Sequence, residues 1–128
     1  MATVAPTPGE EAAAFASFRA HVAAASGKLG KLVTTFSTDA GKGNVAAVKK
    51  DAAAVRSWAK TEATWLDAHP ALGCFANVYV LWDVVREHAD NVAADALAGQ
   101  YEKAASELDT LATVSTNAAD RMAAVVCP

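Results

Sequence analysis

Three histidines and one glutamate are the side chains of this sequence best suited to chemistry. The histidines are His21, His69 and His88, and Glu62 is the one charged residue on an otherwise apolar helical stripe. Metal sites in helical bundles typically use Glu-x-x-His pairs on facing helices, and this sequence has neither that spacing nor His-x-x-x-His. Glu87 and His88 are adjacent, so they point about 100° apart on a helix. The sequence therefore predicts no metal site, with His21 and His88 partly exposed beside the core.

Glu62 has two interpretations. In the first, the helix is rotated locally, Trp58 and Trp65 face the core, and Glu62 reaches solvent or Arg121. In the second, Glu62 is a buried functional carboxylate in a pocket beside Met122. The first interpretation requires no ligand, and the sequence favours it.

Large aromatic side chains define a second candidate site. Counting helical rises places Val22, Trp58, Trp82 and Ser115 at similar heights, which plain core packing explains. The indole N–H groups need acceptors, and Ser115 or His21 could supply one. The alternative is an aromatic-lined cavity for a small apolar ligand. Its candidate ligand-binding residues are Trp58, Trp82, His21, Glu62, Ser115 and Met122.

A haem or metal carrier is the weaker form of this alternative. His21 and Met122 are the only pair that resembles axial haem ligands. Measured from their common end of a bundle, they lie at about 18 Å and about 8 Å, so their heights differ. The sequence also lacks a C-x-x-C-H attachment motif. We therefore predict no cofactor.

The elements that must position these residues are four amphipathic helices, expected over residues 8–37, 44–68, 70–97 and 100–126. Apolar residues in each step by three and four positions, which places them on one stripe of a helix. In the first helix the stripe is Phe15, Phe18, Val22, Ala25, Leu29, Leu32 and Phe36. In the second it is Val45, Val48, Ala52, Val55, Ala59, Glu62 and Leu66. In the third it is Phe75, Val78, Trp82, Val85, Ala89, Val92 and Ala96. In the fourth it is Tyr101, Ala104, Leu108, Leu111, Ser115, Ala118, Met122 and Val125.

Local signals support these boundaries. Thr7 is placed to cap the first helix, with Pro8 at the first helical position, and Asn44 to cap the second. Pro70 is expected in the first turn of the third helix, and Gly99 just after its end. Because all connections are short, each helix runs antiparallel to the one before. The predicted fold is all-α, an antiparallel up-down-up-down four-helix bundle.

The two cysteines, Cys74 and Cys127, test this topology. The start of the third helix and the end of the fourth lie at the same end of such a bundle, so we predict a disulfide between them. A persistent disulfide indicates an oxidising compartment outside the cytoplasm. The alternative is two buried free thiols in a cytosolic protein.

Charge is distributed unevenly along the chain. Residues 1–60 hold eight Lys and Arg against four Asp and Glu, whereas residues 61–128 hold three against ten. Attraction between the two helical hairpins explains this bias. The alternative is a basic face for an anionic partner, carried by Lys28, Lys31, Lys42, Lys49 and Lys50. We predict no nucleic-acid binding, because no aromatic residues interleave these lysines and no nucleic-acid motif is present.

Residues 1–7 are expected to be a disordered, Pro- and Thr-rich linker left after removal of a signal or anchor, and residues 8–128 the bundle domain. No segment has the apolar length of a membrane span. The sequence contains no nucleophile elbow, the strand–turn–helix motif that would indicate an enzyme. The sequence favours a secreted or envelope-tethered bacterial domain with a non-catalytic binding or interaction role. The alternatives are the interior carrier and a cytosolic protein that acts by homo-oligomerisation; the sequence specifies neither the partner nor the oligomeric state.

Overall fold

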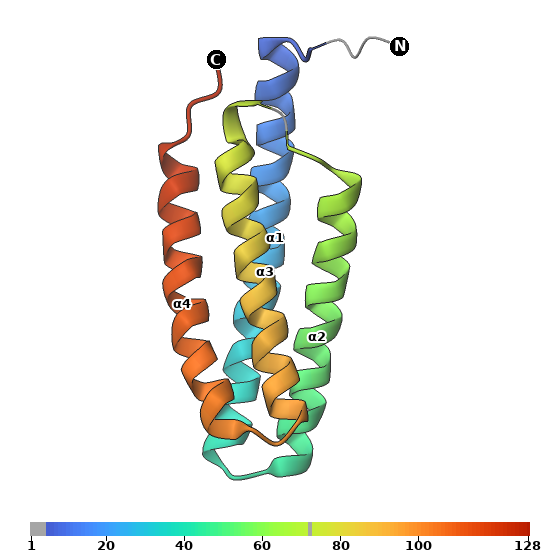
Figure 1. Cartoon of the computed structure of the whole chain (residues 1–128), viewed down its shortest axis with the longest axis vertical. Helices are drawn as coiled ribbons and strands as arrows, with labels where there is room; N and C mark the ends of the chain where they lie inside the picture. The colour runs from blue at the N-terminus through green and yellow to red at the C-terminus, as the bar shows by residue number, and fades with distance from the viewer. Residues whose placement is uncertain (1–4, 72) are drawn as a thin grey trace.

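The computed structural model describes residues 5–71 and 73–128, which form an antiparallel bundle of four α-helices (Figure 1). The helices are α1 (Pro8–Gly41), α2 (Val45–Ala68), α3 (Ala76–Leu97) and α4 (Tyr101–Ala124). A short 3₁₀ turn, η1 (Gly73–Phe75), precedes α3. The predicted all-α, up-down-up-down fold is confirmed.

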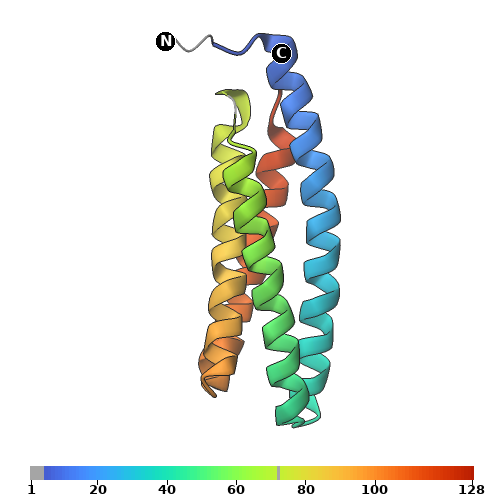
Figure 2. The same ribbon diagram turned by 90° about the vertical axis from the view of Figure 1, so that its right-hand side faces the viewer.

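The helices occupy the corners of a square in which α1 lies diagonally opposite α3 (Figures 1 and 2). Sequence neighbours pack closely, α1 on α2, α2 on α3 and α3 on α4. The fourth edge is different, because the backbones of α1 and α4 hardly approach each other. The bundle is therefore tight on three sides and open on the fourth.

Capping side chains begin the first two helices as the sequence predicts. The Glu10 backbone N–H donates to Thr7 Oγ1 at 3.2 Å, and the Ala47 N–H donates to Asn44 Oδ1 at 3.1 Å. Each such cap contributes about 1 kcal/mol relative to alanine. The last turn of α3 is followed by Gly99 at a φ of 77°, a left-handed conformation that suits glycine.

The predicted start of the third helix is wrong. Pro70 lies outside any helix, and α3 begins at Ala76 after η1. Gly73 has a φ of +31°, which an α-helix does not contain, and a Cβ at this position would collide with the Glu11 carboxylate of α1. Leu72 lies outside the described residues. The other boundaries differ less, since α1 continues to Gly41 and α4 ends at Ala124.

The predicted stripes form the core. All seven predicted stripe residues of the third helix are buried. In α2 only the first predicted position, Val45, is exposed, at 53%. The stripe of α4 is less covered, because Leu108, Ser115 and Met122 are half-buried and Tyr101 is 40% exposed. This weaker burial of α4 agrees with the open edge of the bundle.

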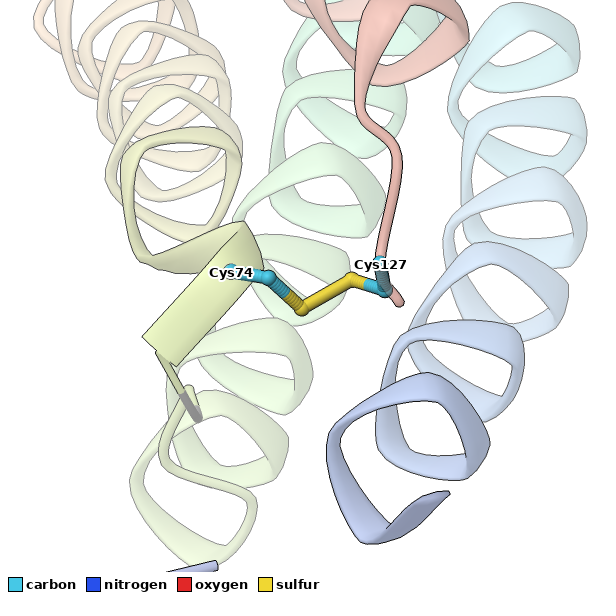
Figure 3. Close-up of a disulfide and its surroundings, with 2 residues drawn as sticks. All are labelled: Cys74 and Cys127. Atoms are coloured by element: carbon cyan, nitrogen blue, oxygen red, sulfur yellow. A yellow bond between two sulfur atoms is a disulfide. The ribbon is translucent and has the colours of Figure 1, made fainter. Parts of the chain in front are cut away.

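A disulfide joins Cys74 to Cys127, as the sequence predicts (Figure 3). The two Cα atoms are 5.6 Å apart, and the cysteines are 53 positions apart along the chain. The chain leaves helical geometry at Val125, and the extended tail carries Cys127 across to η1. We call this pole of the bundle the disulfide end.

The predicted linker, residues 1–7, falls mostly on residues 1–4, which lie outside the described residues. Residues 5–7 precede α1 without regular structure. Within the described segments, no helix combines the length and the apolar character needed to cross a membrane.

Two carboxyl groups meet at the end of the bundle opposite the disulfide. The neighbouring carboxyl group of Asp39 on α1 raises the pKa of Asp51 of α2 above its ordinary value of 3.8. Partial burial and the negative charge of Asp39 act in the same direction, and Lys50 opposes them. Asp51 therefore binds its proton more tightly in the folded protein than in the unfolded chain.

Removal of the disulfide tests the closure of the α3–α4 hairpin. A double variant, Cys74→Ser with Cys127→Ser, is expected to lose up to about 4 kcal/mol of stability, because the unfolded chain regains its loop entropy. Urea unfolding of the oxidised, reduced and variant proteins measures this loss. Equal midpoints for oxidised and reduced protein would contradict the expectation.

The carboxyl pair predicts a pH dependence of stability. Above pH 3.8 the folded state holds a proton that the unfolded chain releases, so stability falls as pH rises from 3.8 through the raised pKa of Asp51. Asp51→Asn is expected to remove this loss and to raise the midpoint of thermal unfolding at pH 7. The matched control is Asp109→Asn on the exposed surface of α4, which should leave the slope unchanged.

Candidate functional site

A buried carboxyl group lies inside the bundle, in the half nearer the disulfide end. Glu62 of α2 is only 3% exposed. Its two oxygens lie 3.0 and 2.9 Å from Nε2 of His21 on α1, and Trp82 Nε1 of α3 donates to Oε2 at 3.0 Å. Nε2 of His21 therefore faces both oxygens of the Glu62 side chain. One side chain is thus bonded to two other helices.

The favoured interpretation of Glu62, in which it reaches solvent or Arg121, is wrong. Glu62 keeps its place on the apolar stripe because donors from α1 and α3 replace the water that burial removes. The expected acceptors of the indole groups are also wrong. Trp82 donates to Glu62, and Trp58 Nε1 donates to the backbone oxygen of Ala25 at 3.0 Å.

His21 is held in place by stacking as well as by its hydrogen bond. Its ring lies 3.6 Å from that of Trp65 at an interplanar angle of 4°, and the His69 ring lies 4.3 Å from the same indole at 12°. Two rings this close to one indole cannot share a face, so they sandwich it. His69 Nδ1 also donates to the Trp65 backbone oxygen at 2.9 Å, which fixes the end of α2.

The disulfide end is packed with aromatic rings. Phe18 lies 5.3 Å from Phe75 and 6.1 Å from Tyr79, measured between ring centroids. The Tyr79 hydroxyl donates to the backbone oxygen of Leu66. Burial raises the pKa of Tyr79, and Asp67 and Asp83 act in the same direction. The hydroxyl therefore remains a donor into more alkaline solution than an exposed tyrosine would.

The open edge of the bundle contains a cavity, which we call the α1–α4 groove. It has a volume of about 630 Å³. Trp82 and Val22 are only 3% and 6% exposed and, with Ala118, close its floor. The lining residues are Ala16, Arg19, Ala20, Val22, Ala23, Ser26, Trp82, Ser115, Ala118, Ala119, Met122 and Ala123.

The structure separates the six residues predicted to bind a ligand into two groups. Trp82, Ser115 and Met122 line the α1–α4 groove. Trp58, His21 and Glu62 belong instead to the packed interior; Trp58 meets Trp82 edge to face, at 5.9 Å and 83°. Trp82 belongs to both groups, because its ring lies in the groove floor while its N–H bonds to Glu62.

Sequence reasoning missed Arg19 and the alanine walls of the groove. A signal was present beside the apolar stripe of α1, where Ala16, Ala20, Ala23 and Gly27 repeat at steps of four and three. All four are exposed, so this face of α1 presents small side chains to solvent. A second stripe of this kind indicates a helix face that packs little against the other helices.

Metal-ligating side chains do not gather at the groove. Within the described residues, no group of three or more His, Cys, Asp and Glu side chains is placed to hold a metal ion. His88 and Glu107 form a separate pair across α3 and α4, with Nδ1 to Oε2 at 3.1 Å. Comparisons of the chain with protein-family models, curated proteins and solved structures find no match.

We expect substitution of His21, which is paired with buried Glu62, to destabilise the protein more than substitution of His88. His21→Ala leaves Glu62 buried with only the Trp82 donor, so we expect a loss of about 2–3 kcal/mol of unfolding free energy. His88→Ala is the matched control. It removes a pair whose two side chains are about one quarter exposed, and should change stability by less than about 1 kcal/mol. Denaturant unfolding at constant pH measures both, and equal losses would contradict the central role of Glu62.

Proposed function

We propose that this protein is a non-catalytic binding domain that works outside the cytoplasm, secreted or tethered to the envelope of a bacterial cell. The observation that carries the proposal is the α1–α4 groove. It is an apolar hollow with a closed floor, a volume in the range of small-molecule sites and a mouth open to solvent. A bundle that buried all four edges equally would offer no such surface.

The position of the ionisable groups supports a binding role rather than catalysis. Glu62 and His21 are hydrogen-bonded to each other and bonded to or stacked on tryptophans, so Nε2 of His21 and both carboxyl oxygens of Glu62 are used within the fold. A general acid or base needs a proton-transferring atom within reach of its substrate. The residues that face the groove are alanine, serine, valine, methionine, tryptophan and a single arginine.

The disulfide supports the proposed location. Disulfides persist in oxidising compartments and are rare in the reducing cytoplasm. The cystine also fixes the end of α4 to η1, which holds one wall of the groove at the disulfide end. The disulfide therefore supports both the proposed oxidising compartment and a groove with one wall fixed in position.

A small apolar molecule is the second candidate within this role, which makes the protein a carrier. The groove favours it, because nine of the twelve lining residues have apolar side chains and the remaining three are Arg19, Ser26 and Ser115. The haem or metal form of a carrier has no comparable support among the described residues.

A neutral fluorescent probe tests the groove as a binding surface. N-phenyl-1-naphthylamine is expected to bind the wild-type protein with an increase in fluorescence. Ala20→Trp, which fills the groove from the wall of α1, is expected to reduce binding at least about tenfold, the effect of about 1.4 kcal/mol. The matched control is Ala24→Trp, an exposed position on the same helix that does not line the groove.

Two results would overturn the proposal. The first is the absence of probe binding to folded wild-type protein. The second is equal binding by the Ala20→Trp and Ala24→Trp variants, which would place the probe elsewhere. Circular dichroism of both variants verifies that each remains helical.

A further inference from the structure

We propose that the natural occupant of the α1–α4 groove is an amphipathic organic anion, with an unbranched apolar tail along the groove and an acidic head group at Arg19. This inference rests on the proposed binding function and specifies its ligand class. It is argued from the shape, the lining and the charge of the groove.

The groove is elongated along the helix axes. Its lining runs from Ala16 to Ser26 on α1, about 15 Å of helix, and from Ser115 to Ala123 on α4, about 12 Å. The two helices are antiparallel, so Ala16 and Ala123 both lie toward the disulfide end. A groove of this length can hold an extended hydrocarbon chain along the helices.

The walls and floor favour an apolar tail that lies in the groove without entering the core. Alanines form the walls on both helices, and these small side chains leave smooth surfaces that an unbranched chain can contact along its length. The floor residues Val22, Trp82 and Ala118 are at most 6% exposed. The hydrophobic area covered on binding, at roughly 25 cal/mol per Å², supplies the affinity.

Arg19 specifies the head group. It is the only charged residue among the described lining residues, and it lies one helical turn from Ala16, near the disulfide end of the groove. Its guanidinium lies 5.5 Å from the centre of the Phe15 ring, and it takes part in none of the ion pairs between described residues. An arginine of this kind matches a carboxylate or phosphate by paired hydrogen bonds.

Binding of decanoate and decanol tests the proposal, since they have tails of equal length and differ in head-group charge. Decanoate is expected to bind wild-type protein about fivefold more tightly than decanol, the value of one exposed ion pair. Added salt should weaken decanoate binding alone. The N–H resonance of Trp82 should shift on binding, and that of Trp65, which does not line the groove, should not.

Arg19→Ala is expected to bind decanoate and decanol equally, with decanol binding unchanged. Arg19→Lys should restore part of the preference, because the charge remains but the paired hydrogen bonds do not. Lys28→Ala is the matched control, an exposed cation further along α1 that is outside the groove. It should retain the full preference of the wild-type protein for decanoate.

The outcomes separate this inference from the proposed function. Binding of the neutral naphthylamine without any preference for decanoate over decanol overturns the anionic ligand and leaves the groove as a binding surface. Equal loss of preference in Lys28→Ala and Arg19→Ala also overturns it, since general charge would then be responsible. Sedimentation in which wild-type protein dimerises and Ala20→Trp does not would identify a second copy as the occupant and overturn it as well.

Discussion

The buried carboxylate of Glu62 is the constraint on which the rest of the structure depends. A carboxyl group that is 3% exposed must find hydrogen-bond partners, and Glu62 of α2 finds them on α1 and α3. These hydrogen bonds fix the axial positions of three helices relative to one another. Contacts between alanines and valines allow helices to slide past each other and cannot do this. A buried polar group often sets register at a cost in stability, and Glu62 is placed to do so here.

The open edge of the bundle follows from the same arrangement. The hydrogen bonds of Glu62 link α1, α2 and α3, and α4 takes no part in them. The fourth helix is attached to α3 by packing and to η1 by the disulfide. Because nothing comparable draws α4 toward α1, a trough remains between them, and the indole that donates to Glu62 closes its floor. The centre of the fold and the candidate site therefore share Trp82.

The sequence predicted those features that periodicity and chain direction determine. The stripe predicted for the third helix is buried at all seven positions, Thr7 and Asn44 cap their helices, and the cysteines pair as the topology requires. It failed where the outcome depends on partners in three dimensions. The spacing that put Glu62 on an inner stripe could not reveal that His21 and Trp82 would meet it. Periodicity also predicts the apolar face of each helix but not how closely two such faces approach. The sequence therefore did not predict the groove or the position of Arg19 in it.

The disulfide gives the two walls of the groove different mechanical character. Together with the short connection between α3 and α4, it closes residues 74–127 into a covalent ring that contains one wall. The opposite wall, α1, is joined to the rest of the bundle covalently only through the turn before α2. A bulkier occupant would therefore displace α1, working against its packing on α2 and its contact with Glu62. The affinity for large occupants and the packing free energy of α1 on α2 are thus thermodynamically linked. Tighter packing of α1 on α2 lowers the affinity for a large occupant, and binding of a large occupant weakens that packing.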